Sequence, residues 1–303
     1  MTLKKRTVSL VLGSGGARGL AHIGVIHWLE EHGYEIQAIS GSSMGALIGG
    51  IYAAGKLDIY TRWVSALRQR DVIRLLDINF SGASLFSGER IMHTLKDLLG
   101  DTNIEDLPIA FTAVATDLDA GREVWFRRGS LFDAIRASIS IPTVFTPVRY
   151  KGHLLVDGGL SNPIPIAPTV TDVTDVTIAV SLSGKQRDLF KETVPHIKPD
   201  SKNQAAYQVA ITRFVENLQE KFSNNKKDEK GTEKEINIFE ITSRSLEAMQ
   251  NTIARFKLAS YNPDFLVEIP ADACSLFDFH RAIEMIELGY RCIAKIIEAQ
   301  AKE

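Results

Sequence analysis

The sequence predicts an α/β protein with a mostly parallel central sheet. Short apolar runs end at glycine-rich loops, and each of these loops precedes a stretch with apolar residues on one helical face. This strand–loop–helix order occurs twice within the first fifty residues, which is typical of parallel βαβ units. The chain has 303 residues, 45% of them hydrophobic, which is enough to bury a large core.

The first unit combines a strand over 7–12 with a helix over 20–31, and the second a strand over 37–40 with a helix over 44–54. Further strands are expected at 109–116, 122–126, 154–156, 176–181 and 265–269. Further helices are expected at 87–99, 130–138, 204–222, 243–259 and 279–300.

No shift in composition marks a second domain. We therefore expect one domain over residues 1–303, with a helical insertion at about 185–260. Inside it, residues 223–235 include no apolar side chain, which predicts a solvated and mobile loop.

Composition excludes several classes of protein. A net charge of −2 gives no reason to expect a nucleic-acid partner. Cys274 and Cys292 are too few for a disulfide scaffold, and no HExxH or CxxC motif indicates a metal, so we expect neither metal nor cofactor. The apolar run at 7–12 is too short for a signal peptide, and residues 36–55 are uncharged but too rich in glycine and serine for a membrane helix. We expect a cytoplasmic protein.

Gly41-Ser42-Ser43-Met44-Gly45 matches the pattern G-x-S-x-G between a predicted strand and a predicted helix. This is the context of a nucleophile elbow, in which a tight turn exposes the serine hydroxyl and the flanking glycines avoid a Cβ clash. The alternative is a flexible, glycine-rich passage in which Ser43 is merely small.

A second glycine-rich loop, GSGGARG, spans Gly13 to Gly19. Backbone amides at a helix N-terminus can stabilise a developing oxyanion, and Gly15, Gly16 and Ala17 are the expected donors, with Arg18 fixing the loop. The loop also resembles a dinucleotide-binding turn, but Arg18 stands where a glycine is required and no acidic residue follows the second strand. A nucleotide-binding protein remains an alternative.

Asp157 follows a short apolar run and precedes Gly158 and Gly159, so we expect its carboxylate at the carboxyl end of a strand, beside the two loops above. It could accept a proton from a serine or cap the following turn. His196 and His280 follow Asp157, but neither stands in a glycine-bearing turn, and His22 is interpreted as a core residue. The sequence favours a Ser–Asp dyad over a triad.

The segments LVLGSGGARGLAHIGVI, SGSSMGAL, AIRASISIPTVFTPV and VDGGLSNPIP, in this order and spacing, resemble the patatin-like phospholipase family. The match is closest to small bacterial members related to the catalytic domain of neuropathy target esterase. The resemblance covers about residues 7–183 well and the rest only weakly. Ser14 departs from the unbroken glycine run of many relatives.

This resemblance implies a three-layer α/β/α fold and an acyl hydrolase acting on fatty acyl esters of phospholipids or lysophospholipids. It makes Ser43 the nucleophile, Asp157 its base and the loop Gly15–Arg18 the oxyanion hole. The motif glycines that it matches are Gly13, Gly19, Gly41, Gly45, Gly158 and Gly159. The alternative is a scaffold or regulatory protein that keeps the fold without useful catalysis.

An apolar substrate also predicts peripheral contact with a membrane, at the inner face if the protein is cytoplasmic. Residues 204–222 have the spacing of an interfacial lid, and residues 62–76 mix basic and apolar side chains that could contact anionic lipid. A helix packed on the core is the commoner explanation of the first pattern, and a half-exposed helix is the commoner explanation of the second. The sequence does not predict the oligomeric state, the acyl chain or the head group.

Overall fold

The computed structural model describes residues 6–77, 84–184 and 238–300. The chain separates into two compact units, one formed by residues 1–187 and 249–303 and the other by residues 188–248. The fold and the site described below belong to the first unit. The predicted helix at 204–222 and the predicted loop at 223–235 lie outside the described residues.

An eight-stranded sheet forms the centre of the first unit, in the order β5-β6-β3-β2-β1-β7-β8, with β4 also paired to β3. The five strands β3, β2, β1, β7 and β8 are parallel, whereas β4 and β6 run antiparallel to β3. The strands are β1 (Arg6–Leu12), β2 (Tyr34–Ser42), β3 (Ala110–Asp117), β4 (Arg122–Phe126), β5 (Val148–Tyr150), β6 (His153–Asp157), β7 (Val176–Gly184) and β8 (Phe265–Pro270). The prediction of a mostly parallel sheet is confirmed.

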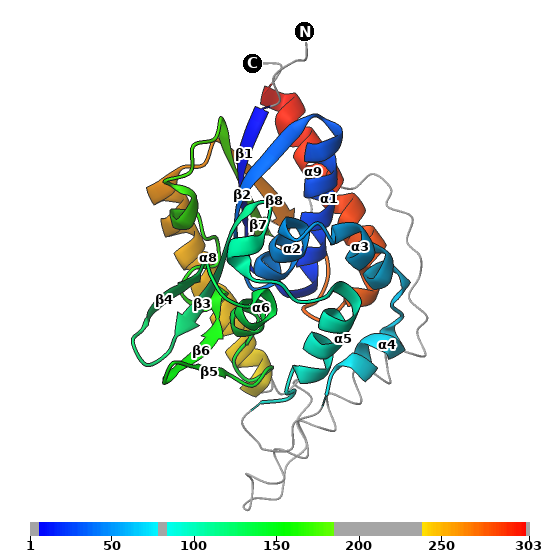
Figure 1. Ribbon diagram of the computed structural model, residues 1–303, viewed down its shortest axis with the longest axis vertical. Helices are drawn as coiled ribbons and strands as arrows, with labels where there is room; N and C mark the ends of the chain where they lie inside the picture. The colour runs from blue at the N-terminus through cyan, green and yellow to red at the C-terminus, as the bar shows by residue number, and fades with distance from the viewer. Residues whose placement is uncertain (1–5, 78–83, 185–237, 301–303) are drawn as a thin grey trace, which may run out of the picture. The chain divides into compact units, whose positions relative to one another are not determined.

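Helices cover both faces of the sheet (Figure 1). They are α1 (Ala21–Glu31), α2 (Met44–Ala53), α3 (Leu57–Ala66), α4 (Gln69–Leu75), α5 (Glu89–Leu99), α6 (Leu131–Ser138), α8 (Ile238–Tyr261) and α9 (Ala282–Gln300). The buried side chains of β1 alternate between the two layers. Val11 belongs to a cluster with Ala254 of α8, whereas Leu12 packs beside Gly49 of α2. The result is the expected three-layer α/β/α arrangement.

On one face, α1 and α9 lie side by side (Figure 1) and cross at two glycines. A Cβ added at Gly24 would lie 1.8 Å from the carbonyl oxygen of Ile286, and one added at Gly289 would lie 1.9 Å from that of Ala21. Both helices therefore need glycine at the crossing, because any side chain would push them apart. The C-terminal helix is thereby fixed against the first βαβ unit.

The basic and apolar stretch at 62–76 does not form one helix. The helix α3 ends at Ala66, Leu67 and Arg68 have extended backbone, and α4 begins at Gln69. This break lets both helices direct apolar side chains towards the same pocket. Among the described residues, no helix is long and apolar enough to cross a membrane.

Candidate active site

Ser43 occupies the sharp turn between β2 and α2. Its backbone has φ 55° and ψ −121°, a region that residues with a side chain rarely adopt. A Cβ added at Gly41 would lie 2.4 Å from the backbone carbonyl carbon of Gly45, and one added at Gly45 would lie 2.0 Å from the carbonyl oxygen of Leu12. The two glycines of the G-x-S-x-G pattern are thus required sterically, as the sequence predicted.

The buried side chain of Ser138, at the end of α6, supports this turn. The Ser43 amide donates to Ser138 Oγ at 2.9 Å, and Ser138 Oγ donates to the carbonyl oxygen of Val114 at 2.6 Å. Sequence reasoning assigned no role to Ser138, because a serine near a helix end has no distinctive local pattern.

The pairing of β3 explains how Asp157 reaches Ser43. One edge of β3 pairs with β4 from Ala113 to Asp117. The other edge is shared, because Val114 pairs with Ser42 at the end of β2 and Ala115 pairs with Asp157 at the end of β6. Since β2 and β6 run in opposite directions, their carboxyl ends meet along this edge.

This geometry corrects one expectation. The sequence predicts Asp157 beside the two loops, at the common carboxyl edge of parallel strands. The strand β6 is in fact antiparallel to β3 and therefore to β2. Asp157 thus reaches Ser43 from a strand that runs towards the end of β2 from the opposite direction. The two residues meet as predicted, but by a different strand arrangement.

The hydroxyl of Ser43 donates to Asp157 Oδ2 at 2.5 Å, and the amide of Gly159 donates to Asp157 Oδ1 at 2.7 Å. Both side chains are buried, with Asp157 only 1% exposed. Burial raises the pKa of Asp157 to about 7, while the hydrogen bonds from Ser43 and Gly159 act in the opposite direction. The carboxyl group can therefore take up and release a proton near neutral pH.

Histidine has no part in this arrangement among the described residues. The ring of His22 is fully buried, and its Nε2 lies 2.9 Å from the carbonyl oxygen of Gly13, so Nε2 carries the proton. Burial lowers the pKa of His22 to about 4, which keeps the ring neutral. His280 lies on the short helix η5 (Phe279–Arg281), and His196 lies outside the described residues. No described histidine hydrogen-bonds to Ser43 or Asp157.

The glycine loop leads from β1 into the short helix η1 (Gly16–Leu20). Arg18 holds it, as expected, by donating from Nε to the carbonyl oxygen of Gly15 at 3.2 Å and from Nη1 to that of Ala271. The amide of Ala17, however, donates to the carbonyl oxygen of Leu276 at 2.9 Å, so it is not available for an oxyanion. The expectation for Ala17 is corrected accordingly.

The amides of Gly15 and Gly16 have no acceptor within the described part of the chain. Gly16 lines the same pocket as Ser43 and Met44. Gly16 also has φ 58°, and an added Cβ would lie 2.3 Å from Leu276 Cδ1, so this position requires glycine. Two predicted donors, Gly15 and Gly16, therefore remain.

Ser43 lies at a pocket whose other lining residues are almost entirely apolar. They come from η1, α2, α3, α4, α5, the segment after α6 and the segment leading into η5. Among the described lining residues, Tyr60 and Trp63 are the only ones besides Ser43 whose side chains contain nitrogen or oxygen. A pocket of this kind accommodates a hydrocarbon chain rather than a charged group.

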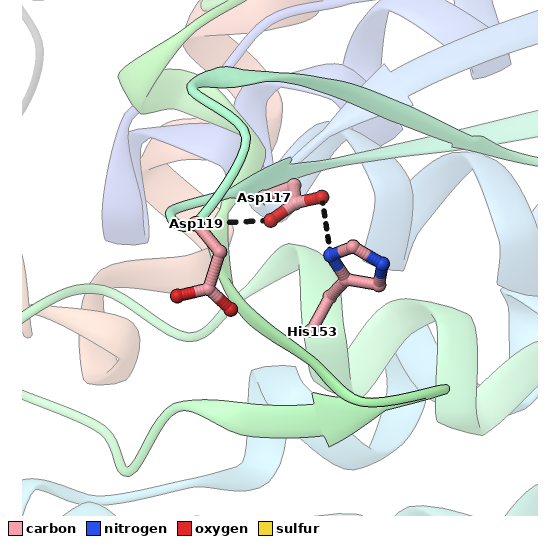
Figure 2. Close-up of side chains that lie close together, drawn as sticks. All are labelled: Asp117, Asp119 and His153. Atoms are coloured by element: carbon pink, nitrogen blue, oxygen red, sulfur yellow. Dashed lines mark hydrogen bonds and ion pairs between the residues drawn. The ribbon is translucent and has the colours of Figure 1, made fainter.

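Figure 2 shows a second cluster of side chains, Asp117, Asp119 and His153, where β3 and the start of β6 lie close together. Asp117 Oδ2 lies 3.1 Å from His153 Nδ1, and Asp117 Oδ1 accepts the amides of Asp119 and Ala120 at 3.0 and 3.1 Å. Asp119 Oδ2 accepts the amide of Leu154 at 2.9 Å. These hydrogen bonds close the turn after β3 and account for the cluster without a metal ion.

The three-layer fold and the strained serine between strand and helix define an α/β protein with nucleophile-elbow geometry. Residues 10–170 match the model of the patatin-like phospholipase family, and the chain belongs to this family.

Several relatives are similar over different parts of the chain. An NTE family protein of Mycobacterium tuberculosis is 40% identical over 330 residues, covering 96% of this chain and 91% of the relative. Lysophospholipase nte1 of Emericella nidulans is 35% identical over 183 residues, which are 59% of this chain and 12% of that protein. Among solved structures, VipD from Legionella pneumophila matches with a TM-score of 0.49 and 14% identity, covering 98% of this chain and 67% of that one.

Proposed function

We propose that this protein is a serine acyl hydrolase that cleaves fatty acyl esters of phospholipids or lysophospholipids. The observation that carries the proposal is the 2.5 Å hydrogen bond from Ser43 Oγ to Asp157 Oδ2 beside an apolar pocket. Membership of the patatin-like phospholipase family supports it, and so does the name of the Emericella nidulans relative, a lysophospholipase.

In the proposed reaction, Asp157 takes the hydroxyl proton as Ser43 Oγ attacks the ester carbonyl carbon. The negative charge on the former carbonyl oxygen is stabilised by the amides of Gly15 and Gly16 and by the N-terminal end of α2, which begins at Met44. Asp157 then returns the proton to the leaving alcohol. Asp157 next takes a proton from a water molecule, whose oxygen attacks the acyl carbon, and it returns that proton to Ser43 Oγ as the fatty acid leaves, which restores the enzyme.

The raised pKa of Asp157 makes a single carboxylate a competent base. A carboxylate with an ordinary pKa of about 3.9 is a weak base at neutral pH, whereas one near 7 matches the pH at which it has to act. Burial therefore supplies the basicity that a histidine supplies in a triad.

The test is hydrolysis of p-nitrophenyl butyrate, together with labelling by a fluorophosphonate probe. Ser43→Ala should abolish both, and Asp157→Asn should reduce both strongly. Ser42→Ala is the matched control, because the buried Ser42 hydroxyl has no hydrogen-bond partner among the described residues and its loss should leave activity largely unchanged. Activity above a few per cent in Ser43→Ala would contradict the proposal, and so would a wild-type protein that reacts with neither reagent.

A panel of substrates determines which head group and how many acyl chains the protein accepts. Matched phospholipids, lysophospholipids and simple esters of one acyl chain should all lose hydrolysis in Ser43→Ala. Their relative kcat/KM values then assign the substrate class.

A further inference from the structure

His22, near the start of α1, is a fully buried histidine that the proposed reaction does not use directly. Its Nε2 donates to the carbonyl oxygen of Gly13, the first residue of the glycine loop, at 2.9 Å. The other ring nitrogen, Nδ1, is buried and has no hydrogen-bond partner among the described residues. Within the described part of the chain, the ring therefore forms its hydrogen bond to the glycine loop alone.

The unpartnered Nδ1 of His22 costs stability, because a buried acceptor without a donor has lost its hydration. Leucine would remove that cost but would also remove the donor to the Gly13 carbonyl. His32, at the other end of α1, gives the contrast. Its Nδ1 bonds to the carbonyl oxygen of Trp28 at 2.8 Å, and its ring is exposed, so water can reach the other nitrogen. The polar ring of His22 is thus explained by the hydrogen bond to Gly13.

This hydrogen bond fixes the first peptide plane of the glycine loop. A peptide group is planar, so a held carbonyl oxygen also orients the amide that follows it. His22 holds the Gly13 carbonyl, and the Ser14 amide in the same plane donates to the carbonyl oxygen of Pro163 at 2.9 Å. This plane is therefore held at both of its polar groups.

The plane with the Gly15 amide lies between two held planes. On its far side, Arg18 Nε donates to the Gly15 carbonyl oxygen at 3.2 Å and thereby orients the Gly16 amide. The Gly15 amide itself has no acceptor within the described residues, so its direction depends on the planes on either side. His22 fixes one of these planes, and Arg18 fixes the other.

We propose that His22 is a positioning residue that aims the Gly15 amide at the oxyanion of the reaction. It acts through the Gly13 carbonyl and touches no reacting atom. This inference rests on the proposed function, because it assumes that the Gly15 and Gly16 amides stabilise an oxyanion. The charge on that oxygen develops in the transition state, so a misdirected amide should lower kcat and leave KM nearly unchanged.

The experiment measures kcat and KM for p-nitrophenyl butyrate, the rate of fluorophosphonate labelling and the melting temperature. In His22→Leu, which has no donor, kcat and the labelling rate should both fall by about 10- to 100-fold, less than the loss of a whole oxyanion-hole donor. In His22→Gln, the amide nitrogen can take the place of Nε2, so kcat should stay within about 3-fold of wild type. His32→Leu is the control, because it loses the same kind of hydrogen bond on the same helix and should keep the wild-type kcat.

A folded His22→Leu variant with the wild-type kcat would overturn the inference. An equal loss in His22→Leu and His22→Gln would also overturn it, because the shape of the ring would then matter rather than its hydrogen bond. If His22→Leu does not fold, His22→Asn replaces it, since the shorter amide cannot reach the position of Nε2. Equal kcat values for His22→Asn and His22→Gln, or a loss above 10-fold in His22→Gln, would contradict the proposal. A wild-type protein without Ser43-dependent hydrolysis would contradict the proposed function itself.

Discussion

The backbone amide of Ser43 donates a hydrogen bond to the side chain of Ser138, with 2.9 Å between Ser43 N and Ser138 Oγ. Because Ser138 Oγ also donates to the carbonyl oxygen of Val114, one hydroxyl connects the serine turn to α6 and to β3. The turn has a rarely adopted backbone conformation, which persists only when its surroundings hold it. Ser138 is the side chain in the best position to do so.

Removing the Ser138 hydroxyl should therefore slow the reaction without abolishing it. In Ser138→Ala, the Ser43 amide and the Val114 carbonyl lose their shared partner, so the turn can relax and move the Ser43 hydroxyl. A displacement of about 1 Å can cost about 10²-fold in rate, and we expect kcat to fall by about 10- to 100-fold with little change in KM. Steady-state kinetics and the rate of fluorophosphonate labelling measure this. An unchanged labelling rate would show that the Ser43 turn keeps its conformation without the Ser138 hydroxyl.

The pKa of Asp157 predicts the pH dependence of hydrolysis. The group acts as a base only when deprotonated, so kcat/KM should rise with pH and level off above about 7. At pH 5 only about 1% of the groups would be carboxylate, so kcat/KM should fall about 100-fold from its plateau. The measurement is a pH–rate profile with a simple ester. A flat profile between pH 5 and 8 would be inconsistent with a buried aspartate as the base.

The same pKa predicts how stability depends on pH. Folding raises the pKa of Asp157 from 3.8 to about 7, so between these values the folded state binds more protons than the unfolded state. The contribution of Asp157 to stability is present in full below pH 3.8 and is lost as pH rises through 7. Asp157→Asn mimics the protonated group, so its advantage in melting temperature over wild type should be larger at pH 8 than at pH 5. At pH 8 the corresponding difference in the free energy of unfolding is at most about 4 kcal/mol.

The control for this comparison is Ser43→Ala, which keeps the carboxyl group in its buried place and should retain most of the wild-type pH trend. A difference between Asp157→Asn and wild type that stays constant from pH 5 to pH 8 would contradict the raised pKa.

The variant Gly158→Ala tests the close contact between the ends of β2 and β6. A Cβ added there would lie 2.0 Å from the carbonyl oxygen of Val114 and 2.6 Å from Ser42 Oγ, so Gly158→Ala must separate the two strand ends. We expect a loss of about 2–3 kcal/mol in the free energy of unfolding and loss of fluorophosphonate labelling. Gly121→Ala is the control, because that glycine has φ 63° but open space around it. The control should cost about 1 kcal/mol and retain labelling. A loss in Gly158→Ala no larger than that in the control, with labelling retained, would contradict the predicted crowding at Gly158.

Features that depend on neighbouring residues are predictable from the amino-acid sequence. Most predicted strands and helices lie within a few residues of the observed ones, for example the strand predicted at 122–126 and β4 at Arg122–Phe126. The turn at Ser43 was also predictable, because a positive φ and a close backbone approach require glycine at fixed distances from the serine. Periodicity and glycine spacing are local properties, so the sequence carries them directly.

The packing of distant segments determines which partners these local features find. Asp157 reaches Ser43, 114 residues away, because β4 occupies one edge of β3 and leaves the other to β2 and β6. The amide of Ala17 donates to the carbonyl oxygen of Leu276, more than 250 residues away, for a similar reason. Each outcome depends on which distant group fills a given space after packing, and no spacing within one segment determines that.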